Sequence, residues 1–93
     1  MITLNVFYTA KPGKGKAFID ALFAEDIPAA CLAEEGCFQY DYFFAKDNED
    51  LILLVEQWKD EAAQEFHCNT AHMKRLRELK AAFVESTEIK TYK

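Results

Sequence analysis

The chain has 93 residues, of which 51% are hydrophobic and 14% aromatic, and its formal net charge is -5. A chain of this length encloses one modest core, so we expect a single domain spanning residues 1–93. The acidic balance argues against nucleic acid, whose phosphates are held by clustered Lys and Arg. The N-terminus lacks the basic and apolar regions of a signal peptide, and no stretch approaches the roughly 20 apolar residues of a membrane span. We therefore expect a cytoplasmic protein that binds neither nucleic acid nor membrane.

Three cysteines, Cys31, Cys37 and Cys68, are odd in number and show no CxxC spacing. An odd set excludes a full disulfide framework and fits a reducing compartment. We interpret all three as packing residues.

The first part of the chain predicts a strand followed by helix. Residues 2–9, "ITLNVFYT", alternate in the period-2 pattern of a strand with one apolar face. The turn residues of "KPGKGK" end that strand. A helical pattern follows, which Pro28 breaks or restarts before Gly36 ends the segment.

Two further strands are predicted in the middle of the chain. Residues 46–50, "KDNED", form the hairpin loop between them. Residues 51–58, "LILLVEQW", are apolar in both parities until Glu56, so this strand is expected to be central and covered on both faces. The preceding strand spans residues 37–45 and places four aromatic residues in one row, as core or as a dimer interface: Phe38, Tyr40, Tyr42 and Phe44.

The last third predicts two helices and an edge strand. Asp60 can cap the first helix, and Asn69 or Thr70 can cap the second. Residues 84–93 are rich in β-branched residues and charged along one side, as in an edge strand. The core stripe of the second helix consists of Met73, Leu76, Leu79 and Phe83.

The order β-α-β-β-α-β predicts an α+β fold, a four-stranded antiparallel sheet with its helices on one face. The strands at 2–9 and 51–58 carry apolar side chains in both directions, so the other sheet face also needs cover. A second copy of the chain is the simplest candidate, and we expect a homodimer.

Three segments, "KPGKGKAFIDAL", "EEGCFQYD" and "VEQWKDEAAQEFHCNTAHM", resemble the antibiotic biosynthesis monooxygenase (ABM) domain family, which includes quinol monooxygenase-like proteins. The resemblance implies a ferredoxin-like fold of the dimeric α/β-barrel type, and a pocket between sheet and helices. The family often has a basic residue near Leu32, which this chain lacks. Haem-degrading relatives have Trp near the position of His67 and His near Arg77, so haem degradation is disfavoured.

Glu56 and Trp58 share one strand parity and therefore one face of the sheet. If that face carries the pocket, the indole binds substrate and the carboxylate serves as a general base, because burial raises a carboxyl pKa. The alternative is structural: Trp58 fills space beneath a helix, and Glu56 accepts a hydrogen bond from a helix end or a histidine.

His72 begins the last helix, where it can reach toward Glu56 and act as a base near pH 7, or it ties loop backbone together. His67 either contributes to substrate binding or is structural. Asn5 lies on the strand expected beside residues 51–58, so its amide either faces the pocket of Trp58 and binds substrate or lies on the surface.

The sequence has no dinucleotide, nucleotide or acyl-enzyme motif, and His67, Cys68 and His72 lack the fourth ligand of a recognised zinc pattern. We therefore predict no cofactor and no metal. The leading interpretation is a cofactor-independent monooxygenase that acts on a small apolar or aromatic quinol and uses O₂. The alternatives are an isomerase of a small carbonyl compound by proton transfer, and a noncatalytic dimeric protein that binds a small molecule.

Overall fold

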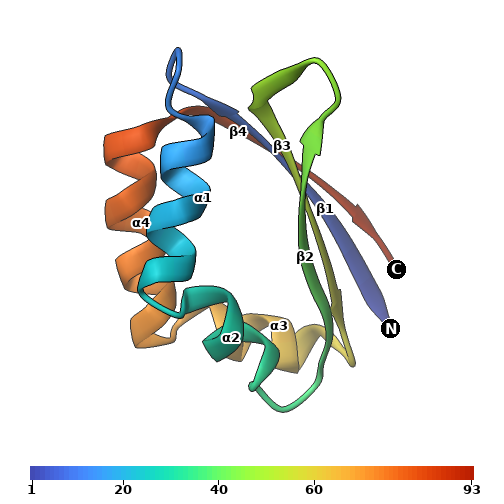
Figure 1. Ribbon diagram of the computed structural model, residues 1–93. Coiled ribbons are helices and arrows are strands. Elements are labelled where there is room, and N and C mark those ends of the chain that lie inside the picture. Colours follow the sequence, from blue (N-terminus) through green and yellow to red (C-terminus); the bar gives the residue numbers. More distant parts are fainter.

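The computed structural model describes residues 1–93, which form a sheet covered on one side by helices (Figure 1). The strands are paired antiparallel in the order β2-β3-β1-β4, which confirms the predicted α+β, ferredoxin-like fold. No helix combines the length and the apolar composition needed to cross a bilayer. The elements, in chain order, are β1 (Ile2–Ala10), α1 (Gly15–Ala24), α2 (Ile27–Leu32), β2 (Cys37–Ala45), β3 (Asn48–Trp58), α3 (Glu61–Cys68), α4 (Ala71–Phe83) and β4 (Val84–Tyr92).

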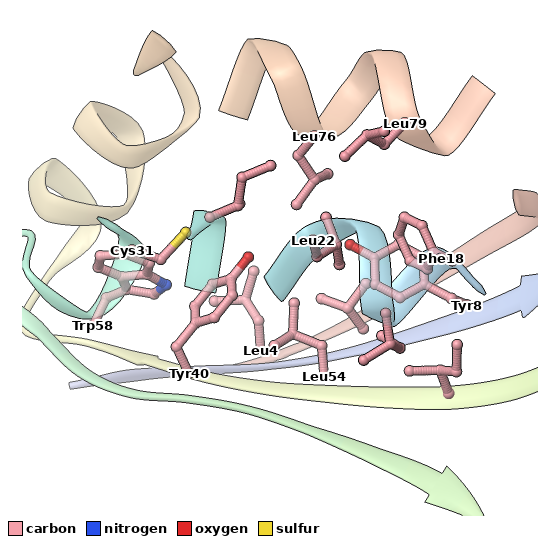
Figure 2. Close-up of a cluster of buried hydrophobic side chains, with 14 of the residues drawn as sticks. Leu4, Tyr8, Phe18, Leu22, Cys31, Tyr40, Leu54, Trp58, Leu76 and Leu79 are labelled. Carbon is pink, nitrogen blue, oxygen red and sulfur yellow. The ribbon is translucent and has the colours of Figure 1, made fainter. Parts of the chain in front are cut away.

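The sheet has an inner face, which the helices cover, and an outer face, which they leave open. Side chains alternate between the two faces along each strand. On β1 the inner residues are almost fully buried, and the inner side of β3 continues this core as far as Trp58. Large inner side chains from the sheet and from helices α1 and α4 fill this core: Tyr8, Phe18, Leu22, Leu54, Trp58 and Leu76 (Figure 2).

The helix boundaries follow the signals in the sequence. Asp60 caps α3 by accepting the Ala63 N–H, and Thr70 caps α4 by accepting the Met73 N–H. Asn69 is not the cap of α4, because its amide instead donates to the Glu65 carbonyl. The predicted break at Pro28 is confirmed, since α1 and α2 are separate helices.

Two details of the β2–β3 hairpin differ from expectation. Only residues 46–47 lie between the strands, because β3 extends back to Asn48. A register shift between Cys37 and Gln39 places Cys37 opposite Trp58 and leaves Phe38 59% exposed. Phe38 therefore does not share the row of Tyr40, because a bulge adds a residue and reverses the alternation.

The cysteines also differ from expectation. Cys31 is buried in the core and Cys37 is partly buried, but Cys68 is exposed. The interpretation of Cys68 as a packing residue is therefore wrong, because it lies at the solvent side of the C-terminal end of α3.

The outer face contains large apolar side chains that no part of the chain covers. Phe7 is 38% exposed, Phe43 49%, Leu51 44% and Tyr92, which pairs with Thr3 on this face, 54%. The central strand β3 is therefore covered on one face only within a single chain. As predicted, β4 is an edge strand, and nearly all of its residues are exposed.

The tip of the β2–β3 hairpin is fixed to the start of α1. The Asp50 carboxylate accepts the N–H groups of Gly13 and Gly15, each at 2.9 Å. A Cβ on Gly15 would lie 1.9 Å from the Glu49 carbonyl oxygen, so only glycine permits this approach.

Candidate functional site

Glu56 is a carboxylate within the apolar inner face of β3. The residue is only 6% exposed and lies between Leu4 of β1 and Tyr40 of β2. The indole Nε1 of Trp58 donates a hydrogen bond of 3.0 Å to its Oε1. Burial raises the pKa of Glu56 to about 7; the Trp58 hydrogen bond opposes this shift, and the charge of Glu34 adds to it. A carboxyl group with this pKa is suited to exchanging protons near neutral pH.

Glu34 joins the two histidines. It lies in the turn after α2, two residues before Gly36, which adopts a positive φ of 86°. Its Oε2 is 2.7 Å from Nδ1 of His67 and 2.7 Å from Nε2 of His72. Its other oxygen, Oε1, is buried and has no hydrogen-bond partner. One carboxylate oxygen thus holds imidazoles from two different helices.

His67 lies between Glu34 and Glu56. Its ring centroid is 4.4 Å from that of Trp58, and the residue is 2% exposed. The Nε2 atom is 3.8 Å from Oε1 of Glu56, which is beyond hydrogen-bond distance, and it has no partner. Burial lowers the pKa of His67, and the hydrogen bond and charge of Glu34 oppose that shift.

His72 is in the first turn of α4, and its side chain is 22% exposed, whereas those of Glu34 and His67 are 6% and 2% exposed. Its hydrogen bond to Glu34 connects it indirectly to His67. We define the acid–imidazole chain as Glu56, His67, Glu34 and His72, taken in this order.

The structure brings together four of the five predicted site residues, Glu56, Trp58, His67 and His72, although His72 reaches Glu56 only through Glu34 and His67. Asn5 is the exception. It pairs with Val55, whereas Leu4 pairs with Glu56, so its amide lies on the outer face. The expectation that Asn5 shares a pocket with Trp58 is wrong. The catalytic and binding roles of the other four remain predictions.

A groove opens beside this group at the edge of the sheet. The hydroxyls of Tyr40 and Tyr42 are buried and have no hydrogen-bond partner. The Tyr40 ring also contacts the His67 ring, with centroids 5.7 Å apart. Figure 2 shows Trp58, Tyr40 and Cys31 gathered at one end of the core, away from Tyr8 and Phe18. The lining of the groove comes from α1, α2, β2 and the turn before α2: Phe23, Asp26, Pro28, Ala29, Leu32, Tyr40, Asp41 and Tyr42.

Cys31, Glu34, His67 and His72 each bring one potential ligand atom to within 4.8 Å of the others. The fold therefore supplies Cys31 and Glu34 beside the two histidines. However, Glu34 Oε2 is 2.7 Å from both imidazole nitrogens, whereas ligands around a tetrahedral ion lie about 3.3 Å apart. Burial also raises the pKa of Cys31 to about 12, which disfavours the thiolate that a metal requires. The observed contacts are those of a hydrogen-bonded network rather than of a ligand set.

Comparisons with known proteins concern the family and the fold. The family model "Antibiotic biosynthesis monooxygenase" matches residues 1–79. The chain is 40% identical over 72 residues to the Bacillus subtilis (strain 168) protein named "Putative monooxygenase YcnE", covering 77% of this chain and 74% of that protein.

Two solved structures show the same fold. The Pseudomonas aeruginosa protein PA3566 aligns with a TM-score of 0.88 and 35% identity, over 98% of this chain and 90% of its own. A structure from Nitrosomonas europaea aligns with a TM-score of 0.90 and 23% identity, over 100% and 97% of the two chains. The second likeness is evidence for the fold alone.

Proposed function

The chain belongs to the antibiotic biosynthesis monooxygenase family, and from this premise we propose that it is a cofactor-independent monooxygenase acting on a small aromatic quinol. The observation that carries the proposal is Glu56, a buried carboxylate whose partner is an indole N–H and not a cation. A carboxylate in this setting is a general base, because burial makes it ready to accept a proton.

The reaction needs no external reductant. Deprotonation of the quinol produces an electron-rich anion that passes an electron to O₂, and recombination forms a carbon–oxygen bond. One oxygen atom enters the ring and the other leaves as water. A benzenediol and O₂ thus give a hydroxyquinone and water, with the four electrons that reduce O₂ all supplied by the substrate.

In this proposal Glu56 takes the substrate proton, while the hydroxyls of Tyr40 and Tyr42 donate hydrogen bonds to the substrate oxygens. The two hydroxyls are buried without partners, so a bound acceptor would satisfy them. Trp58 packs against the aromatic ring, and His67 orients the site. Tyr40 lines the groove and pairs with Glu56, which does not line it, so the proposal requires the Tyr40 ring to turn aside when substrate enters.

An isomerase remains the alternative, because a carboxylate base beside hydroxyl donors also suits proton transfer next to a carbonyl group. Such an enzyme would consume no O₂. A noncatalytic binding protein would show neither O₂ consumption nor proton exchange, and would respond to ligand only through Trp58 fluorescence.

The test is O₂ consumption with 1,4-naphthalenediol, measured with an oxygen electrode and corrected for autoxidation. We expect enzyme-dependent uptake that Glu56→Gln lowers by about 10² to 10⁴, the usual contribution of a positioned base. Glu49→Gln is the matched control, because it makes the same change at an exposed position of the same strand. Uptake that is equal in the wild type and Glu56→Gln would overturn the proposal.

We also propose that the protein is a homodimer through the outer sheet face. Phe7, Phe43 and Leu51 are exposed there beside one another across three neighbouring strands. A stable interface of this kind buries roughly 2,000 Å² in total. Analytical ultracentrifugation at micromolar concentration tests it, and a sole species of 10.7 kDa would contradict it.

The same proposal requires a purified protein without haem, flavin or stoichiometric metal. We expect ultraviolet absorption from Trp and Tyr alone, with no visible band, and less than one metal ion per chain by elemental analysis. Oxygen uptake that is lost after dialysis against a chelator and restored by one metal would contradict cofactor independence.

A further inference from the structure

We propose that His67, Glu34 and His72 form a proton relay that returns protons from Glu56 to solvent between turnovers. This inference rests on the proposed role of Glu56 as a base and adds a path by which that base is reset. The relay gives Glu34 and both histidines functions that do not require them to touch the substrate.

Two of the three contacts in the acid–imidazole chain have hydrogen-bond length, and the third is longer. His67 Nδ1 and His72 Nε2 are each 2.7 Å from Glu34 Oε2, so two links already have hydrogen-bond length. The remaining link, from Glu56 Oε1 to His67 Nε2, is 3.8 Å. A contraction of roughly 1 Å would complete it.

Within the acid–imidazole chain, the side chain at the His72 end is the most exposed, as a relay that delivers protons to solvent requires. The side chains of Glu56, His67 and Glu34 are 8%, 2% and 6% exposed, whereas that of His72 is 22% exposed. The Glu56 side chain is therefore largely shielded from bulk water, and that of His72 is the most exposed of the four.

The hydrogen bonds to Glu34 also leave Nε2 of His67 free to accept a proton from Glu56. An ionised carboxylate only accepts hydrogen bonds, so with Glu34 ionised both contacting ring nitrogens carry protons. His67 is then neutral with its proton on Nδ1, in keeping with a pKa that burial lowers. Its Nε2 is an acceptor without a donor, and it is the ring atom directed at Glu56.

No other neighbour of Glu56 can accept a proton in its place. The remaining titratable groups that interact with it are phenols and thiols, and burial raises the pKa of each, so they are already protonated near neutral pH. These groups come from β1, α2, β2 and α3: Tyr8, Cys31, Cys37, Tyr40, Tyr42 and Cys68.

One turn of the relay transfers one proton and leaves every member as it began. The Glu56 carboxyl proton passes to His67 Nε2, and the proton on His67 Nδ1 passes to Glu34 Oε2. The His72 ring then turns so that its unprotonated Nδ1 faces Glu34 and accepts the Glu34 proton, and Nε2 releases its proton to water. Rotation of the His67 ring then returns a protonated nitrogen to the Glu34 side and an unprotonated nitrogen to the Glu56 side.

A first experiment needs no substrate. Histidine ring ¹⁵N NMR between about pH 5 and 9 should show His67 as the neutral Nδ1–H form, and its Nε2 signal should shift as Glu56 titrates. Glu56→Gln should abolish that step, whereas the exposed control Glu49→Gln should retain it. A His67 spectrum that is the same in the wild type and Glu56→Gln would overturn the relay.

The second experiment measures turnover of 1,4-naphthalenediol with and without imidazole in the buffer. His72→Ala should lower steady-state turnover at least about tenfold, because the relay loses its exit, and millimolar imidazole should restore most of it through the opening at the surface. The wild type and the exposed control Lys74→Ala should not respond to imidazole. Absence of rescue in a folded His72→Ala variant would overturn the relay.

The two experiments separate this inference from the proposed function. NMR coupling between Glu56 and His67 without any O₂ uptake would support the proton path and contradict the monooxygenase. Uptake that depends on Glu56 but not on His72 would support the monooxygenase and contradict the relay.

Discussion

The two faces of the sheet are built from the same strands yet differ in chemistry. The inner face encloses a polar chain within an apolar core, beginning at Glu56 and leading toward solvent at His72. The outer face has large exposed apolar side chains, and it places Gln57, the next residue after Glu56, beside Thr3. Neighbouring residues on β3 therefore face the proposed catalytic site on one side of the sheet and the proposed dimer interface on the other.

Leu54 and Leu53 provide a matched test of this difference, because identical side chains occupy neighbouring positions on opposite faces. Leu54 is fully buried, so Leu54→Ala should lower the free energy of unfolding by about 2–5 kcal/mol through lost burial and a cavity. Leu53→Ala should cost less than about 1 kcal/mol in the monomer. Urea unfolding measures both.

Unfolding of the Leu53→Ala and Leu54→Ala variants should also be compared at several protein concentrations. If the outer face is a dimer interface, Leu53→Ala should weaken dimerisation and make the unfolding midpoint depend differently on concentration. Equal losses for the two variants at concentrations where the protein is monomeric would contradict the assignment of the faces.

Glu56 should make the protein less stable as pH rises. Its folded pKa of about 7 lies above the ordinary value of 4.5, so the folded state holds the proton more tightly than the unfolded state. Its contribution to stability should therefore fall between about pH 4.5 and 7, by on the order of 3 kcal/mol. Glu56→Gln should flatten this slope, whereas exposed Glu49→Gln should preserve it. Thermal unfolding across this pH range provides the measurement.

Trp58→Phe should change the same pH dependence in a smaller and distinct way. The indole hydrogen bond lowers the pKa of Glu56, so its removal should move the midpoint of the Glu56 transition upward by roughly one pH unit. A ¹³C-labelled carboxyl signal reports the midpoint directly. A downward shift would show that loss of the bulky ring admits water and outweighs loss of the hydrogen bond.

At the opposite end of the sheet, Asp50 has a pKa shift of the opposite sign. Backbone N–H bonds from Gly13 and Gly15 lower its pKa, so its stabilisation is present above the unfolded pKa and is lost as pH falls through the folded value. Asp50→Asn should lower the melting temperature slightly at neutral pH, with the difference disappearing in acid. Asp47→Asn, an exposed change in the adjacent turn, should have no such effect.

The sequence predicts the framework well because alternation and capping are local signals. Glu56 and Trp58 could be placed together from their spacing alone, Asp60 could be identified as a helix cap, and Thr70 was one of two candidates for the next cap. The same alternation places Asn5 on the same face as Phe7 and on the other face from Leu4. The outward position of Asn5 could therefore have been predicted from the strand pattern.

Glu34 could not be found in this way. It stands next to Glu35 in a turn, and no local pattern distinguishes the two carboxylates. Its histidine partners are 33 and 38 residues away, so the contacts exist only after α3 and α4 have packed beside α2. The bulge at Phe38 is similar, since it depends on how β2 pairs with β3.

The first strand of the sheet in chain order occupies a middle position in it. β1 pairs with β3 on one side and with β4, the last strand of the sheet in chain order, on the other, with Tyr92 opposite Thr3. Contacts between the ends of a chain form slowly, because the whole intervening length must first be ordered. Until β4 has been synthesised, β1 keeps an unpaired edge, and a nascent chain is then open to pairing with other chains. Synthesis of β4 therefore closes the period in which this edge of β1 can pair with another chain.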